Sequence, residues 1–281
     1  MSSTNTSGGH WYDKDAKAVY TQIVKSGKRK GLDRPTSLAD ARKQSLLPSV
    51  SGITGIVSSD ALVGYMMREV AKVAYVRQPH KGEDVAAYTN ELILKSREDG
   101  ATAAQLGTEV HDGLERYYSE PLFDHEPCPL TMPDGTTVDR WDFIKPAIDA
   151  IGELKLIVTD AEKNVVNLPY GYAGKTDILF TQGDNVGVLD FKSKRSKAGQ
   201  KIVPYETQIM QVAAYIAAHW GTLGEESIPK NSVGYNIYIS TTEVGRVEVV
   251  EYSYDQLIEA WEAFKACLTI WRYKNKFDPR Q

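Results

Sequence analysis

The feature that most constrains the fold is a change in hydrophobic periodicity partway along the 281-residue chain. From Pro48 to Tyr118, apolar residues recur three or four positions apart, which is the spacing of one face of a helix. From Leu154 onward, short runs rich in β-branched and aromatic residues alternate with turn residues, a pattern that indicates strands. The interval between them holds Pro121, Pro127, Pro129 and Pro133. Because proline interrupts helices and central strands, we expect a connecting loop there.

The strand-rich half predicts a definite order of elements. Strands are expected at 156–158, 165–166, 172–181, 186–191, 233–241 and 246–252, with helices at 205–220 and 254–273. The turn Gln182-Gly-Asp-Asn185 should join two of these strands in an antiparallel hairpin. We therefore expect an α/β fold. Its predicted divisions are an N-terminal, partly ordered arm (1–45) and one domain (46–281) made of a helical subdomain (46–120), the loop (121–145) and a sheet core with closing helices (146–281).

Composition excludes some classes of protein. With 33 basic and 37 acidic residues the net charge is −4, so a polyanionic partner would need a local basic patch. Cys128 and Cys267 are the only cysteines, too few for a disulfide framework or an iron–sulfur cluster, and we expect free thiols and no cluster. Apolar runs are too short to span a membrane, and the first residues lack the apolar core of a secretion signal. We expect a soluble, cytoplasmic protein with no membrane partner.

Charged side chains gather on the predicted hairpin. Asp177 lies on its first strand, and Asp190 and Lys192 lie on its second, where residues two apart project from the same face. Two carboxylates near a core are costly unless a cation neutralises them, which suits Mg²⁺ or Mn²⁺. Such a metal would activate water and bind phosphate. The alternative is a solvated hairpin that merely alternates in charge.

Four motifs occur in order around this hairpin. They are Gly107-Thr-Glu-Val-His111, Gly174-Lys-Thr-Asp177, Asp190-Phe-Lys192 and Gln211-Val-Ala-Ala-Tyr215. Together they resemble the RecB-like branch of the PD-(D/E)XK nucleases, whose pattern is GxxxH, GxxD, DxK and QxxxY. The segment Leu47-Pro-Ser-Val-Ser is similar to the corresponding segment of phage exonucleases and of the mitochondrial genome maintenance exonuclease. The resemblance covers roughly residues 46–220 and implies a mixed central sheet flanked by helices, preceded by a helical subdomain.

The resemblance also implies roles for individual residues. Asp177, Asp190 and the carbonyl of Phe191 become metal ligands, and Lys192 orients or activates the attacking water. His111 becomes a further ligand, and the glycine one turn before it lets another element approach closely. A mixed nitrogen and oxygen ligand set favours Mn²⁺ over Mg²⁺ without excluding either. The alternative for His111 is an ordinary core or surface histidine.

Further residues have weaker assignments. Glu162 occupies the position at which related exonucleases carry an acidic residue, on the strand before that of Asp177. There it would bind metal through water or accept a hydrogen bond from Lys192. Gln211 and Tyr215 would support the site and meet substrate phosphate, or else simply pack on the sheet. The basic segment after Asp190 has no acidic residue, and it would contact a phosphate backbone unless it is only solubilising. Its members are Lys192, Lys194, Arg195, Lys197 and Lys201.

The expected function is that of a Mg²⁺- or Mn²⁺-dependent DNA exonuclease acting at free ends of single-stranded DNA. Phage-type replication, recombination or repair in a bacterial cytoplasm is the expected setting, with proteins of those processes as possible partners. The alternatives are a structure-specific or restriction-type endonuclease of the same fold, and a non-catalytic DNA-binding module.

The preference for ends depends on the helices before His111. If they lie beside the site, their basic residues would form a wall around a strand and their tyrosines would stack on bases. These residues are Arg68, Lys72, Arg77 and Lys81, with Tyr65 and Tyr75. The alternative is a plain helical cap on the sheet.

Overall fold

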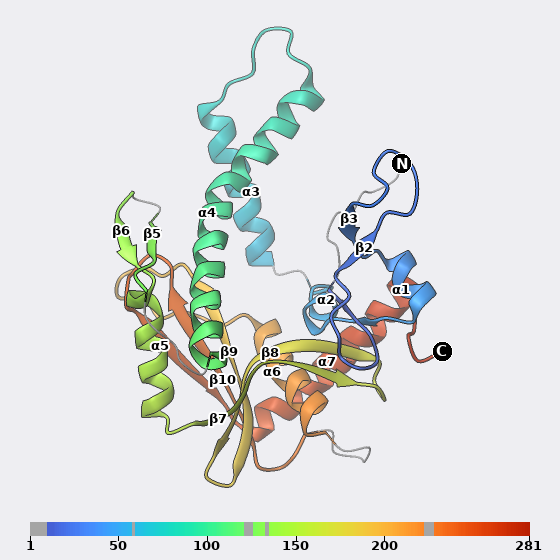
Figure 1. Cartoon of the computed structure of the whole chain (residues 1–281). Helices are drawn as coiled ribbons and strands as arrows, with labels where there is room; N and C mark the ends of the chain where they lie inside the picture. The colour runs from blue at the N-terminus through green and yellow to red at the C-terminus, as the bar shows by residue number, and fades with distance from the viewer. Residues whose placement is uncertain (1–9, 58–59, 121–125, 133–134, 222–227) are drawn as a thin grey trace.

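The computed structural model describes residues 10–57, 60–120, 126–132, 135–221 and 228–281. In this part of the chain, the main sheet has five strands in the order β11-β10-β9-β8-β7 (Figure 1). They are β7 (Ile157–Asn167), β8 (Tyr172–Gln182), β9 (Asn185–Lys194), β10 (Ser232–Ser240) and β11 (Val247–Tyr252). Strands β9 and β10 are parallel, and the other neighbours are antiparallel. The predicted α/β fold with a mixed sheet is confirmed.

Helices cover both faces of the sheet. They are α1 (Leu38–Gln44), α2 (Val50–Thr54), α3 (Asp60–Val76), α4 (Val85–Ser119), α5 (Trp141–Glu153), α6 (Glu206–His219) and α7 (Tyr254–Asn275). One buried cluster joins α2, α6 and α7 to one face, and a second joins α4 and α5 to the other. Because β10 lies between these two layers, every one of its residues is buried. This double cover explains why its sequence is a continuous apolar run with few polar interruptions.

The β8–β9 hairpin follows the prediction closely. Its turn places Gln182 opposite Asn185, and Gly183 adopts a φ of 58°, which glycine reaches without steric cost. The two short strands expected at 156–158 and 165–166 are instead parts of β7, which shifts register between Val158 and Asp160. A β-bulge of this kind bends a strand without ending it, which explains the interrupted sequence pattern.

The N-terminal residues pack on the core. Strand β1 (Trp11–Tyr12) pairs with β4 (Leu47–Pro48), and β2 (Thr21–Ile23) pairs with β3 (Asp33–Pro35). Within the segment predicted to be a partly ordered arm, Trp11 and Tyr12 are buried. The Trp11 ring meets that of Trp271 on α7 edge to face, with 6.1 Å between centroids. The start of the described chain is thereby fastened to its closing helix.

The segment predicted as a loop contains structure. Strands β5 (Pro129–Thr131) and β6 (Thr137–Asp139) pair with each other, and α5 begins at Trp141 although Pro146 lies inside it. A proline is tolerated in a short edge strand, where a missing donor removes little. The prediction of a loop over 121–145 was therefore wrong for these residues, whereas Pro121 and Pro133 lie outside the described ones.

Helix α3 and the N-terminal half of α4 project away from the sheet (Figure 1), whereas the C-terminal half of α4 packs on it. Helix α4 runs unbroken over 35 residues. At the outer end of the pair, Arg77 forms ion pairs with Glu83 and Glu91, which tie the α3–α4 connection to α4. Among the residues that the structure describes, no helix is both long and apolar enough to cross a membrane.

Candidate active site

The candidate site lies where β8 and β9 separate. Their last paired residues are Ile178 and Leu189, directly before Asp177 and Asp190 along the ladder. In place of another ladder bond, Oδ2 of Asp177 accepts a hydrogen bond of 2.7 Å from the backbone N–H of Phe191. The carboxylate thus satisfies the backbone N–H of Phe191, which lies beyond the last paired residues of β8 and β9.

Asp190 is the most enclosed charge of the group. Its side chain is 4% exposed, and its Oδ2 lies 2.6 Å from Nζ of Lys192, which confirms that the two share a face. Asn236 of β10 donates to the same oxygen at 2.9 Å, and the hydroxyl of Tyr252 donates to Oδ1 of Asn236 at 2.8 Å. Sequence reasoning missed Asn236 and Tyr252. A lone amide within the apolar run 232–240 was the signal that could have found Asn236.

The electrostatics favour a cation between the two carboxylates. Burial, and then the negative charge of Asp190, raise the pKa of Asp177 well above its usual range. Burial alone would lower the pKa of Lys192, but the charges of Asp190 and Asp177 outweigh it and leave that pKa raised. Lys192 therefore stays protonated at neutral pH. One ammonium group does not fully offset two buried carboxylates, so an added cation would lower the cost of ionising Asp177.

His111 faces this pair from α4. Its Nδ1 lies 4.0 Å from Oδ2 of Asp177, and its side chain is 34% exposed. Burial, with help from the charge of Lys192, lowers the pKa of His111, so the imidazole is neutral and keeps a lone pair to offer a ligand. A Cβ added to Gly107 would overlap the side chain of Ser193 on β9. The predicted need for glycine one turn before the histidine is confirmed.

A second charged group adjoins the first. The Glu162 carboxylate pairs with Lys175, whose Nζ also lies 3.3 Å from Oε1 of Glu115. Of the two alternatives for Glu162, the hydrogen bond from Lys192 is not the contact seen, because Lys175 on the neighbouring strand takes that place; metal binding through water stays a prediction. Lys175 and Glu115 were missed, although they lie two residues before Asp177 and one helical turn after His111. Sequence spacing alone could have found both.

The conformation of Glu162 is unusual for a residue with a side chain. Its φ is 53°, in the left-handed region, which costs about 1–2 kcal/mol outside glycine. Burial raises the pKa of Glu162 against the opposing effect of Lys175. Glu162, with its left-handed backbone, thus presents its carboxylate to Lys175.

Helix α6 supports the site from the opposite face. Tyr215 is 6% exposed, and a Cβ on Gly174 of β8 would come within 2.6 Å of its ring. Gln211 donates to Oγ1 of Thr54 on α2 at 3.4 Å. Of the two alternatives for Tyr215, packing on the sheet is the one that the structure shows. A contact of either residue with substrate phosphate stays a prediction.

The basic segment after Asp190 is partly used within the protein. The structure places Lys192 and Lys194 on β9, and not in a loop. The Nζ of Lys194 donates to the carbonyl of Val203 and lies 3.8 Å from the centroid of the Tyr205 ring. These contacts give Lys194 a structural role, and its predicted role in binding nucleic acid stays a prediction. Arg195 and Lys197 are exposed and remain available.

The residues present fit a hard divalent cation in their chemistry. Two largely buried carboxylates, with a neutral imidazole beside them, form a donor set that suits Mn²⁺ or Mg²⁺. Within the described residues, no three His, Cys, Asp or Glu side chains are placed to hold one ion together. Side-chain rotations would therefore have to accompany binding.

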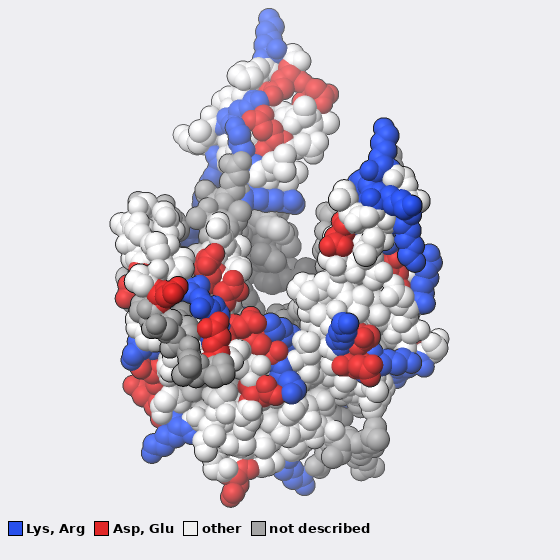
Figure 2. Space-filling model, in the orientation of Figure 1, with Lys and Arg blue, Asp and Glu red and all other residues white. Residues whose placement is uncertain are grey.

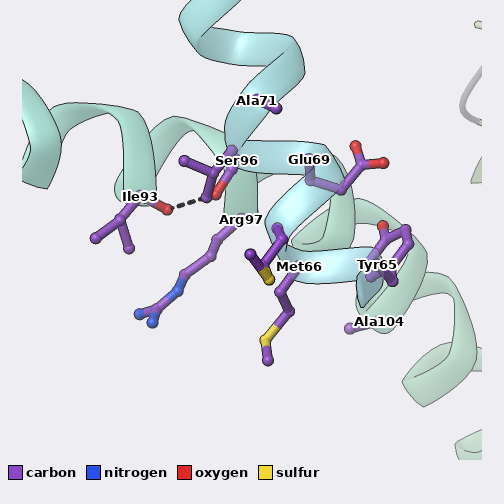
Figure 3. Close-up of a pocket in the computed structure, with 10 residues that line it drawn as sticks. Tyr65, Met66, Glu69, Ala71, Ile93, Ser96, Arg97 and Ala104 are labelled. Carbon is purple, nitrogen blue, oxygen red and sulfur yellow. Dashed lines mark hydrogen bonds between the residues drawn. The ribbon is translucent and has the colours of Figure 1, made fainter. Parts of the chain in front are cut away.

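The surface around the site is hollowed. Figure 2 shows a hollow between the side formed by α4 and the side formed by α1 and α2, with acidic and basic atoms together at its floor. A separate apolar groove of about 800 Å³ lies between α3 and α4 (Figure 3). It is lined by Tyr65, Met66, Met67, Val70, Ile93 and Ala104 among others. At 1.5 Å per residue, Arg97 at this groove lies roughly 20 Å along α4 from His111, so the groove is separate from the charged site.

Comparisons with known proteins add little to this geometry. No family model matches the chain, and no curated protein matches it. A solved structure described as "Crystal structure of SSO0001" has 13% sequence identity and a TM-score of 0.28, over 74% of this chain and 87% of that one. A likeness of that size carries no argument about fold or function.

Proposed function

We propose that the chain is a divalent-metal-dependent nuclease that hydrolyses DNA phosphodiester bonds, built on a PD-(D/E)XK core. One observation carries the proposal. Asp177, Asp190 and Lys192 meet at the point where β8 and β9 separate, and His111 approaches them from another element, 4.0 Å from Asp177. A structural salt bridge would require only one carboxylate for Lys192. The second carboxylate and the imidazole suit a metal site.

The residues divide between holding the metal and handling water. His111, Asp177 and Asp190 would hold Mg²⁺ or Mn²⁺, with the Phe191 carbonyl and, through water, Glu162 as further ligands. When bound, such an ion lowers the pKa of a coordinated water and stabilises charge on phosphate oxygens. Asn236 keeps the Asp190 carboxylate in place by donating to its Oδ2. Lys192, held protonated by its neighbours, donates hydrogen bonds that orient the attacking water.

The finer proposal is an exonuclease that starts from free ends of single-stranded DNA, in phage-type replication, recombination or repair. Its support is the sequence resemblance and the hollow beside α4 in Figure 2. The exposed rings of Tyr65 and Tyr75 remain available for base stacking. The predicted basic wall is weaker than expected, because Lys72 pairs with Glu69 and Arg77 pairs with Glu83 and Glu91.

The test compares closed circular single-stranded DNA with the same circle opened once, and with blunt duplex, in Mn²⁺ and in EDTA. We expect Mn²⁺-dependent loss of the opened circle only. Asp190→Asn should remove that activity, and Asp184→Asn, at the exposed turn of the same hairpin, should retain it and exclude a contaminating nuclease.

Three other results would contradict parts of the proposal. Degradation of the closed circle at the same rate would favour the endonuclease alternative. Equal rates on blunt duplex would remove the single-strand preference. Metal-independent binding without hydrolysis of any substrate would favour the non-catalytic DNA-binding module.

A further inference from the structure

A strongly basic turn lies far from β9 in the sequence. Strands β2 and β3 are joined by residues 24–32, which contain Lys25, Lys28, Arg29 and Lys30 and no acidic residue. All four side chains are exposed, and none of them forms an ion pair with any other described residue. In a chain with more acidic than basic residues, such a turn is an exception. Its four positive charges are available to a partner.

The turn has a defined backbone. The N–H of Val24 donates to the carbonyl of Leu32, and the N–H of Gly31 donates back to Val24, both at 2.9 Å. Gly27 and Gly31 have φ values of 80° and 87°, which glycine adopts without strain. The four cations therefore project from a preformed turn, so a ligand would lose little free energy in ordering it.

The base of this hairpin is fixed to the body of the protein. Arg34 on β3 donates to both oxygens of Asp40 on α1, at 2.6 and 2.8 Å. Asp40 also accepts from the N–H of Ser37, which begins that helix. The buried Thr36 donates its N–H to the carbonyl of Tyr20, just before β2. The hairpin is thus a rigid projection.

The hairpin also adjoins the candidate active site. The hydroxyls of Tyr20 and Tyr12 are 2.7 Å apart, and Tyr12 on β1 pairs with Leu47 on β4. Ser49 forms a β-bridge to Ala173 on β8. Figure 1 places β2 and β3 across from α3 and α4, and Figure 2 shows basic side chains at the top and along the outer edge of the lobe that borders the hollow.

We infer that the β2–β3 hairpin is a second contact for the nucleic-acid backbone, holding the strand outside the catalytic centre; this rests on the proposed function. Phosphates on a strand that leaves the hollow would lie against the four cations. Ile23 and Leu32, 63% and 55% exposed, flank the turn and offer apolar contact to sugars or bases. An acidic protein or an anionic membrane would offer the same charge, but neither explains why the hairpin stands beside the hydrolytic site.

The test measures binding without hydrolysis. A fluorescent single-stranded DNA is titrated in EDTA with the whole chain and with a variant that replaces Lys25, Lys28, Arg29 and Lys30 by alanine. The matched control replaces Lys145, Lys155, Lys265 and Lys274, which lie on or next to α5 and α7, and so removes the same charge elsewhere. We expect the hairpin variant to bind about tenfold more weakly and the control less than about twofold. The slope of log affinity against log salt should fall by up to about 3 for the hairpin variant alone.

The outcomes separate this inference from the proposed function. Equal affinity of the hairpin variant and the control overturns the inference while leaving hydrolysis untouched. A chain that binds DNA through the hairpin but hydrolyses none keeps the inference and removes the proposed nuclease. Unchanged DNA affinity with lost binding to phosphatidylserine vesicles or to polyglutamate would assign the hairpin to a membrane or an acidic protein and overturn it.

Discussion

The end of the β8–β9 ladder and the α3–α4 pair place charged and apolar groups in opposite ways. At the ladder, the carboxylate of Asp190 is almost fully enclosed and accepts a hydrogen bond from Asn236 besides the Lys192 ion pair. Along α3, Met67 is 69% exposed and Tyr75 is 84% exposed, while the charged residues form surface ion pairs. Buried charges require a fixed set of partners, whereas exposed apolar groups do not.

This difference indicates where substitutions should have large effects on hydrolysis or stability. A satisfied buried network is rigid, so loss of one member should change chemistry or stability sharply. A helix pair with few long-range contacts opens locally at low cost, and its methionines adapt to different surfaces. We therefore expect large effects on hydrolysis at the ladder end and small, local effects at the outer end of α3–α4.

The largest effect should come from Asp190→Asn. Asparagine keeps the shape and the neighbours but removes the charge that a metal requires, so hydrolysis should fall at least about a hundredfold, or about 2.7 kcal/mol. Initial rates on linear single-stranded DNA in Mn²⁺ measure it, with Asp184→Asn as the control. More than about a tenth of the original rate would contradict the assignment of Asp190.

Lys192→Met should rank next. Its ammonium orients water but holds no metal, so the rate should fall about thirtyfold while Mn²⁺ affinity by calorimetry stays within about threefold. Lys194→Met, two residues along the same strand, is the control. Because Lys194 is used by Val203 and Tyr205, its loss should leave hydrolysis nearly unchanged. If both variants lose activity equally, Lys192 has no special role.

His111→Ala should weaken metal binding by at least about tenfold, since it removes one ligand of the set. This result would show that α4 and the sheet share a metal. Calorimetry with Mn²⁺ measures the change, and His80→Ala, in the exposed turn between α3 and α4, is the control. Unchanged affinity and stoichiometry would make His111 an ordinary, partly buried histidine.

Asn236→Ala should show its effect in stability. It leaves the Tyr252 hydroxyl without its acceptor and removes a donor from Asp190, so the free energy of unfolding should fall by about 1–3 kcal/mol. Tyr252→Phe removes only the hydrogen bond from the Tyr252 hydroxyl to Asn236, and its cost in free energy of unfolding should be about 0.5–1.5 kcal/mol. Urea unfolding compares the two. A larger cost for Tyr252→Phe than for Asn236→Ala would mean that Asn236 does not link Tyr252 to Asp190.

Much of the fold could be predicted because local signals agreed with the tertiary structure. The turn at Gly183 and the alternation around it fixed the β8–β9 hairpin, and the α6 and α7 patterns matched their helices closely. The prediction was wrong where tertiary contacts override local preference. Pro146 inside α5 is tolerated because the buried Phe143 and Ile144 pack that helix on the sheet.

The site divides in the same way. Asp190 and Lys192 share a face because strand geometry requires it, and sequence spacing is enough to predict that. The pairing of Glu162 with Lys175 involves a residue with a left-handed φ, which local sequence does not predict. Asn236 lies 46 residues from Asp190, so only the parallel pairing of β9 and β10 brings the two together.

The smallest effect should be confined to the outer end of α3–α4. Hydrogen bonds from Arg77 and from the N–H of His80 lower the pKa of Glu83 to about 2. A lowered pKa means that the ionised carboxylate stabilises the fold above its unfolded value of about 4.3, and that this contribution is lost as pH falls through about 2. Protection of amides 77–91 from hydrogen exchange should therefore decline over that interval.

A substitution separates this effect from general acid unfolding. Glu83→Gln should lower protection of amides 77–91 about two- to fivefold already at neutral pH, because it removes the charge without acid. Amides of α6 should not change. Glu69→Gln breaks the ion pair with Lys72 in the middle of α3, and the protection of amides 77–91 should stay unchanged. If Glu83→Gln instead slowed hydrolysis as strongly as Lys192→Met, the outer end of α3–α4 would be coupled to the catalytic site and the contrast between the two regions would fail.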